Sequence, residues 1–146
     1  MAASAWKVFN EAKKFLLTGD IDLNTQVVVL GLFKASSNAS TFTLSTGASV
    51  TVACSQGLIT QKKTLSAITV TAGASAKVIR FDNTDLVFTA STASAFSVLY
   101  AVIYVSGGKA IAWSKLSTSG FSVTATNTLT IQFNASGIFE LSGGVT

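Results

Sequence analysis

The sequence predicts an all-β protein, an antiparallel sandwich or jelly-roll-like barrel, with one α-helix near its N-terminus. Short β-rich runs bounded by turn residues recur along most of the chain, at the 8–12-residue spacing that is typical of sandwiches and barrels. A helical pattern is confined to residues 5–17. The length of 146 residues suits one domain with a substantial core, so we expect a single β domain over 1–146.

The expected helix runs from Ala5 to Leu17. Ser4 is a residue type that caps helix N-termini, and Gly19 is well placed to end the helix in a left-handed conformation. Its apolar residues recur at helical spacing and form one stripe; they are Ala5, Val8, Phe9, Ala12, Phe15 and Leu16. We expect this stripe to cover one side of a sheet, or else to dock on a partner subunit.

The segment after the helix contains Asp20, Asp22 and Asn24, which resemble the opening of a calcium-binding loop. Such a loop needs Gly at its sixth position and Glu at its twelfth, and the sequence has Thr25 and Gly31 there. An alternation of apolar and polar residues therefore explains the spacing better than a metal site.

The remaining strands are predicted from runs of Val, Ile, Leu, Phe and Thr. Gln26–Phe33 is apolar on both faces and reads as a buried strand, in which Gly31 indicates a bulge or a close backbone approach. Shorter strands are expected at 42–44, 50–52, 65–70, 77–81, 86–88, 121–123, 129–133 and 138–141.

The centre of the expected fold is a hairpin over Phe96–Leu116. Its first arm is apolar on both faces, as in a strand covered on both sides, and it carries Tyr100 and Tyr104 on one of them. Gly107 and Gly108 suit the tight turn that leads into the second arm, which includes residues 111–113. Every other element is expected to pack around this hairpin.

The composition describes a weakly charged surface. Charged residues make up 11% of the chain, against about 25% in an average domain, and hydrophobic residues make up 49%. The net charge of +4 comes from scattered lysines and arginine, so we expect no nucleic-acid partner. Apolar runs are too short for a membrane helix, and we expect neither a membrane contact nor a signal peptide.

Residue types that carry catalysis are scarce. The chain has no histidine and a single cysteine, Cys54, which excludes Ser-His-Asp and Cys-His arrangements and a cysteine-based zinc site. Asp82 and Asp85 could form a carboxylate pair, but the intervening Asn-Thr favours a turn. Lys109 follows two glycines as in a phosphate loop, yet Ala110 replaces the required Ser or Thr. We expect no enzyme, metal or cofactor.

Three segments resemble small structural proteins of tailed bacteriophages. One is the opening, Trp-Lys-Val-Phe-Asn-Glu-Ala-Lys-Lys at 6–14, with Gly-Asp-Ile-Asp-Leu at 19–23 and Ser-Ser-Asn-Ala-Ser at 36–40. The others are Leu-Tyr-Ala-Val-Ile-Tyr at 99–104 and the closing stretch 127–139. The resemblance spans most of the chain.

This resemblance implies a virion protein assembled in the cytoplasm of a bacterial host. We expect a capsid decoration (cement) protein that binds the outer shell through the major capsid protein or another virion protein; alternatives are a tail or head-tail component, or a carbohydrate-binding module on a tail fibre. A homo-oligomer is expected, with a trimer favoured. The residues expected to contact a partner lie in the N-terminal segment and on one face of the central strand: Trp6, Lys7, Phe9, Asn10, Lys13, Lys14, Tyr100 and Tyr104.

Overall fold

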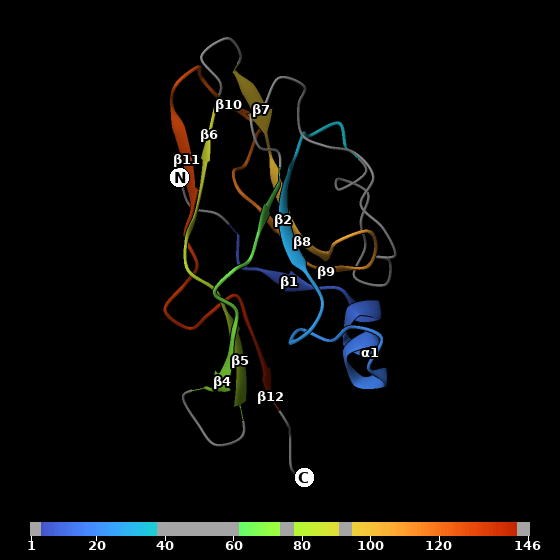
Figure 1. Ribbon diagram of the computed structural model, residues 1–146. Helices are drawn as coiled ribbons and strands as arrows, with labels where there is room; N and C mark the ends of the chain where they lie inside the picture. Colours follow the sequence, from blue (N-terminus) through green and yellow to red (C-terminus); the bar gives the residue numbers. More distant parts are fainter. Residues whose placement is uncertain (1–3, 38–61, 74–77, 91–94, 143–146) are drawn as a thin grey trace.

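The computed structural model describes residues 4–37, 62–73, 78–90 and 95–142, and it confirms an all-β, sandwich-like fold with one N-terminal helix (Figure 1). The helix α1 spans Asn10–Thr18. The strands in these residues are β1 (Lys7–Val8), β2 (Val28–Phe33), β3 (Lys62–Thr64), β4 (Thr69–Ala72), β5 (Val78–Asp82), β6 (Leu86–Thr89), β7 (Phe96–Val98), β8 (Tyr100–Val105), β9 (Ala110–Lys115), β10 (Phe121–Val123), β11 (Thr128–Ile131) and β12 (Phe139–Ser142).

All described strand pairs are antiparallel. The largest sheet has five strands in the order β1-β9-β8-β2-β3, and it lies at the centre of the molecule (Figure 1). Two-stranded sheets β10-β7 and β11-β6 lie at one end of it. The three-stranded sheet β12-β5-β4 projects at the other end, beside the C-terminus, and is here called the arm. No closed barrel forms among the described strands, so the sandwich form of the prediction is the one confirmed.

The predicted central hairpin is present as β8 and β9. Ala101, Val102 and Ile103 are fully buried although they alternate between the two faces of β8, which confirms that this strand is covered on both sides. At the turn, the Gly108 N–H donates to the Val105 carbonyl at 2.9 Å, and Gly107 has φ +84°. The tight turn predicted at Gly107 and Gly108 therefore forms, and of the two glycines only Gly107 adopts a positive φ.

The predicted helix start is wrong. Residues 5–9 do not belong to α1, because Lys7–Val8 form a strand that pairs with β9. Ser4 does not cap the helix either: its hydroxyl accepts the Lys115 N–H at 2.9 Å, and the helix begins after Phe9 without a side-chain cap. The predicted end is confirmed, since Gly19 follows the helix with φ +78°.

A second correction concerns the strand expected over 65–70. Residues 65–68 form a connection between β3 and β4, in which the buried Leu65 donates its N–H to the Val28 carbonyl at 2.9 Å. Gly31 shows the expected close approach, because a Cβ there would lie 3.0 Å from the Phe33 ring. Residues 42–44, 50–52 and 77, where strands were predicted, lie outside the described residues, as does Cys54.

One core joins the helix to the sheets. Phe9, Phe81, Phe88 and Phe96 are its largest fully buried side chains, and each comes from a different part of the chain. Phe81 on β5 stacks on Phe139 on β12, with ring centroids 4.9 Å apart. Both rings belong to the arm and to the core, so the core reaches the base of the arm, while the rest of the arm extends beyond it (Figure 1).

Candidate functional site

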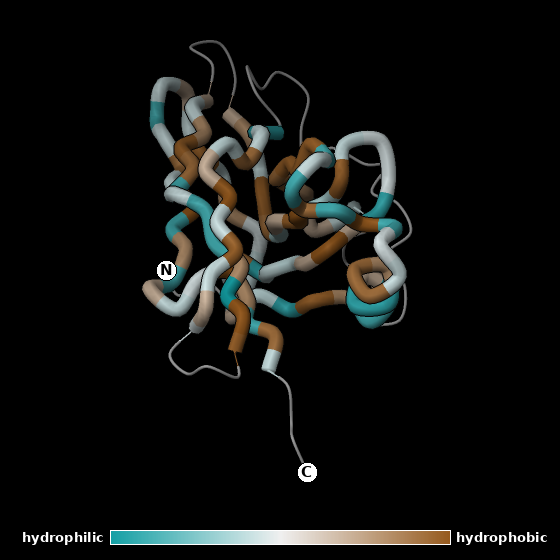
Figure 2. Tube along the Cα trace, turned by 60° about the horizontal axis from the view of Figure 1, so that its bottom comes forward, coloured by the Kyte–Doolittle hydropathy of each residue, from teal (hydrophilic) through white to brown (hydrophobic). Residues whose placement is uncertain are grey.

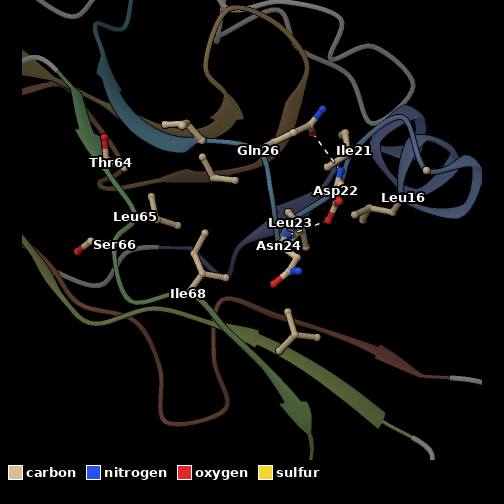
Figure 3. A pocket seen from close by; sticks show the side chains of 14 residues that line it. Leu16, Ile21, Asp22, Leu23, Asn24, Gln26, Thr64, Leu65, Ser66 and Ile68 are labelled. Carbon is tan, nitrogen blue, oxygen red and sulfur yellow. Dashed lines mark hydrogen bonds between the residues drawn. The ribbon is translucent and has the colours of Figure 1, made fainter.

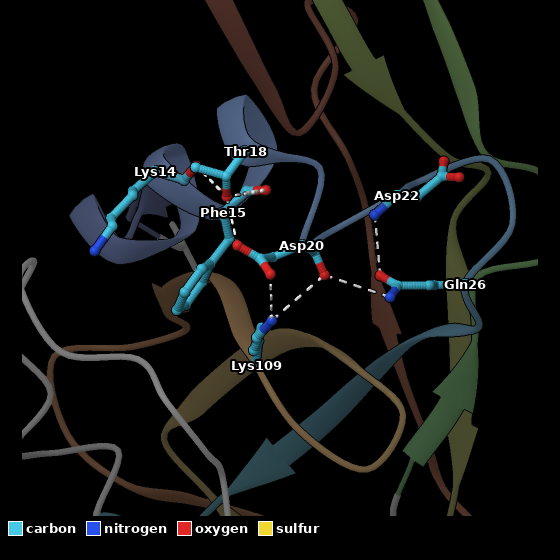
Figure 4. A network of polar contacts seen from close by, with 7 residues as sticks. All are labelled: Lys14, Phe15, Thr18, Asp20, Asp22, Gln26 and Lys109. Carbon is cyan, nitrogen blue, oxygen red and sulfur yellow. Dashed lines mark hydrogen bonds and ion pairs between the residues drawn. The ribbon is translucent and has the colours of Figure 1, made fainter.

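The acidic residues between α1 and β2 are engaged by neighbouring groups; Figure 4 shows the contacts of Asp20 with Thr18 on α1 and with Lys109. The Asp22 carboxylate accepts the Thr25 hydroxyl at 2.7 Å and the Asn24 N–H at 2.8 Å, and these hydrogen bonds lower the pKa of Asp22. The Asp20 carboxylate accepts the Thr18 hydroxyl and lies 3.7 Å from the Lys109 ammonium, and both contacts lower the pKa of Asp20. These contacts explain the Asp-x-Asp-x-Asn spacing without a metal ion.

Asp82 and Asp85 also have structural partners. Asp82 accepts the N–H of Asn83 at 2.8 Å, and Asp85 accepts the N–H of Phe133 at 3.0 Å. The buried Asn83 side chain accepts the Ala67 N–H at 3.0 Å and so ties this segment to the connection before β4. Asp82 ends β5 and residues 83–85 connect β5 to β6 without a regular turn, so the predicted turn does not form there. In the described part of the chain, no three His, Cys, Asp or Glu side chains come close enough together to hold a metal ion.

Among the described residues lies a groove of about 940 Å³ (Figure 3). One wall is the end of α1 and the loop that leads into β2, and the other is the stretch from β3 into β4. The apolar side chains that line it are Leu16, Ile21, Leu23, Val27, Val28, Leu65, Ile68 and Val70. We call this feature the apolar groove.

The apolar groove offers almost no charge to a ligand. Asp22 is the one ionisable residue among its lining residues, and its carboxylate is already bonded within the loop. The polar side chains of Asn24, Thr64 and Ser66 stand at its sides (Figure 3). The polar lining is neutral apart from Asp22, so an apolar segment of another protein could pack here without leaving an unpaired charge stranded.

Apolar exposure continues from the groove onto the arm. Val70 lines the groove from β4 and is 56% exposed. Ile79 and Leu141 stand directly opposite each other on β5 and β12, on the same face of the arm as Val70, and are 48% and 42% exposed. Figure 2 shows these apolar stretches on the strands beside the C-terminus. Large side chains exposed in one continuous area commonly mark an interaction surface.

Residues predicted to contact a partner are divided among several places. Phe9 is fully buried and belongs to the core, so it is not part of any binding surface. Asn10, Lys13 and Lys14 are exposed on α1. Leu17, which the prediction did not include, is 89% exposed on the same helix.

The two tyrosines and Lys7 lie on one face of the central sheet. The rings of Tyr100 and Trp113 pack in a T-shaped arrangement with their centroids 6.3 Å apart. The Lys7 ammonium lies 5.2 Å from the centroid of the same Trp113 ring. Tyr104 is partly buried, and burial raises the pKa of its phenol. The structure thus joins Lys7 to Tyr100 through Trp113, a contact that the sequence did not predict.

Trp6 stands between two smaller cavities. One of about 240 Å³ also involves Ser114 and Thr130, and the other, of about 570 Å³, also involves Asn134; Gln132 lines both. The Trp6 ring packs against Phe133 with centroids 5.8 Å apart. An aromatic ring beside amide and hydroxyl groups is the kind of surface that a neutral sugar could use.

Compared with protein-family models, curated protein sequences and solved structures, the chain matches none. Across the described residues, no helix is long and apolar enough to cross a membrane.

Proposed function

We propose that this protein is a structural component of a bacteriophage virion and that it decorates the outside of the capsid. The apolar groove is the observation that carries the proposal: it is an open surface whose one ionisable lining residue, Asp22, is bonded within its own loop, on a protein in which only 11% of residues are charged. Such a surface can be buried against another protein without desolvating unpaired charges. The resemblance of its terminal and central segments to phage structural proteins supports the same role.

The groove also supports a role for the N-terminal segment in the proposed capsid contact. Leu16 lines the groove from α1, and the neighbouring Leu17 is almost fully exposed. Lys109 holds this end of the helix, because its ammonium lies 4.5 Å from the Phe15 ring centroid and 3.7 Å from the Asp20 carboxylate (Figure 4). We therefore place the capsid contact at the C-terminal end of α1 together with the apolar groove.

The experiment uses particles of the phage that encodes the chain, with and without its gene. Purified protein is added back to the deficient particles, and DNA release is followed during heating. Decoration predicts that the deficient particles release DNA at a lower temperature, and that added protein restores the original value. Imaging of the complete particle should show the protein on the outer shell. If the protein were found on the tail, the decoration role would be wrong and the tail or head-tail role would be supported. If the protein were absent from the particle, both roles would be excluded.

A matched pair of variants tests the groove. Val27→Asp places a charge in the groove, and Val87→Asp places one on the outer side of β6; both valines are exposed, at 54% and 42%. Both variants should fold, since surface substitutions usually change stability by no more than about 0.5 kcal/mol. Only Val27→Asp should fail to restore heat resistance. Equal restoration by the two variants would exclude the groove as the contact.

A carbohydrate-binding module is a second candidate, and the two cavities at Trp6 are the observation that favours it. A panel of neutral oligosaccharides, titrated by calorimetry, tests it directly. Binding that Trp6→Ala abolishes, with the fold retained, would support this candidate. No heat from any sugar at millimolar concentration would exclude it.

A further inference from the structure

The outer edge of β4 has no partner strand. β4 pairs with β5 on one side, and β5 in turn pairs with β12. In the residues that the structure describes, nothing pairs with the other side of β4, and all four of its residues are exposed. Figure 1 shows β4 at the side of the arm that faces away from β12. The arm therefore ends in an open strand edge.

The register identifies the backbone groups at this edge. The Gly73 N–H donates to the Val78 carbonyl at 2.7 Å, so these two residues form a hydrogen-bonded pair. Such pairs alternate along an antiparallel ladder, which makes Thr71 and Arg80 the next one. The N–H and C=O groups of Val70 and Ala72 consequently point away from β5. The edge thus presents two donors and two acceptors to a strand that would lie beside it.

Apart from its short length of four residues, β4 lacks the features that usually protect an edge from pairing. Natural edges are protected by short strands, charged side chains, proline, bulges or covering segments. The strand reads Thr-Val-Thr-Ala, without charge or proline, and its register against β5 is unbroken over four pairs. Its side chains are exposed rather than covered.

We propose that β4 pairs antiparallel with β4 of a second copy of this chain, about a twofold axis at Thr71. In this register Val70 of each copy lies opposite Ala72 of the other, so that each outward donor meets an outward acceptor and four backbone hydrogen bonds form. Thr71 lies opposite Thr71 of the second copy, a cross-strand pair that is favourable in sheets. The two arms become one six-stranded sheet.

The backbone pattern of the β4 edge favours a second copy as the occupant, because its outward donors and acceptors are self-complementary about Thr71. Each chain carries a net charge of +4, which opposes association, so the contact requires that no charge at the edge be left unpaired. Arg80, the nearest cation on β5, is bound to Glu140 at 3.2 Å. On the opposite face, Ile79 and Leu141 of both copies would line one apolar surface. A twofold contact closes after two copies, and so a dimer takes the place of the trimer expected from the sequence.

Charge exchange at Thr71 tests the pairing and its register. Thr71→Lys and Thr71→Glu each set like charges opposite each other in a homodimer, and an equal mixture sets opposite charges there. Light scattering on the wild-type chain should give about twice the monomer mass of 15.0 kDa at high concentration. Each variant alone should dissociate at least about tenfold more readily, which corresponds to a loss of roughly 1.4 kcal/mol. The mixture should return to the dimer mass.

A backbone variant tests the hydrogen bonds independently of charge. Ala72→Pro removes an outward N–H, a change that the free side of an edge strand tolerates. It should give monomers whose circular dichroism matches the wild type, while Val87→Lys, a charge added on β6, should leave the dimer intact. Should Ala72→Pro unfold, the charge exchange alone decides. A wild-type mass that stays at 15.0 kDa up to about 1 mM chain, a trimer mass, or a dimer that both Thr71 variants preserve would each overturn the proposal.

Discussion

Gly137 should be the least replaceable of the three left-handed glycines in the described chain. Gly19, Gly107 and Gly137 have φ of +78°, +84° and +81°, so alanine is strained at each to a similar extent. The space around them differs. A Cβ on Gly137 would lie 2.8 Å from the Phe81 carbonyl oxygen, and nothing lies within 4 Å of a Cβ on either of the others. The three positions therefore separate backbone strain from steric conflict.

The expected magnitudes follow from these contacts. Left-handed backbone costs alanine about 1–2 kcal/mol, which should be the whole loss for Gly19→Ala and Gly107→Ala. In Gly137→Ala the Phe81 carbonyl must also move, although it accepts the Ile138 N–H at 2.9 Å. That hydrogen bond contributes about 1 kcal/mol, and the displaced Phe81–Phe139 stack roughly another 1 kcal/mol. We expect Gly137→Ala to lower the free energy of unfolding by about 3–4 kcal/mol.

Urea unfolding of the wild type and the three variants measures these differences. On a thermal scale, each kcal/mol corresponds to roughly 2–4 °C at this chain length. Gly137→Ala should therefore melt clearly below Gly19→Ala and Gly107→Ala, which should resemble each other. If all three variants lost the same free energy to within about 0.5 kcal/mol, the steric argument at Phe81 would be refuted.

Three further outcomes are expected. Phe9→Ala should lower the free energy of unfolding by about 3–5 kcal/mol, whereas Leu17→Ala on the exposed side of the helix should change it by less than about 0.5 kcal/mol; urea unfolding distinguishes them. Lys109→Ala should lower it by at most about 1 kcal/mol, and by less in high salt, because its ion pair is exposed. The pKa values of Asp20 and Asp22 are lowered in the fold, so these groups stabilise the protein above their ordinary pKa of 3.8, and this contribution is lost as the pH falls through the lowered values. In a series of melting temperatures measured at decreasing acidic pH, the Asp22→Asn variant should lose less stability than the wild type does.

The strands that the sequence predicted well are those whose burial leaves a local signature. Val28–Phe33 and Tyr100–Val105 are apolar on both faces, and both prove to be inner strands of the central sheet. A strand covered on both faces must be apolar throughout, because either face would otherwise bury polar groups. This requirement acts within six residues and can therefore be read from the sequence alone.

The helix start could not be predicted by the same means. Ala5, Val8 and Phe9 fit a helical period, and Ser4 is a common capping residue. What decides the conformation is the pairing of β1 with Ala112 and Trp113, more than one hundred residues further along the chain. The Phe9 N–H donates to the Ile111 carbonyl at 3.0 Å, a contact with no local sequence signal. A long-range backbone ladder thus overrides the local helical pattern.

The apolar groove was missed for a related reason. Its two walls were predicted as separate apolar segments, with Leu23 in one and Ile68 in the other. An apolar residue in a strand pattern is normally assigned to the core, and only the tertiary arrangement determines which of them remain accessible. Val27 and Val70 have the same side chain as the buried Val28, yet more than half of each is exposed. Local pattern predicts apolar character well and exposure poorly.

The groove and the β4 edge use different parts of the same strand, and this makes the two proposals compatible. The Val70 side chain lines the groove over one face of the arm, while its backbone N–H and C=O lie in the plane of the sheet. A second copy added in that plane leaves the groove over the face open, so a dimer presents two grooves. On the proposed function, each groove would bind mainly by apolar contact, since Asp22 is its one ionisable lining residue, and this would give a modest affinity on its own. Two linked grooves on a repetitive surface would raise the effective concentration of the second contact, and attachment would become far stronger than through either groove alone. A dimeric arm would therefore turn a weakly charged surface into a stable attachment to a regular shell.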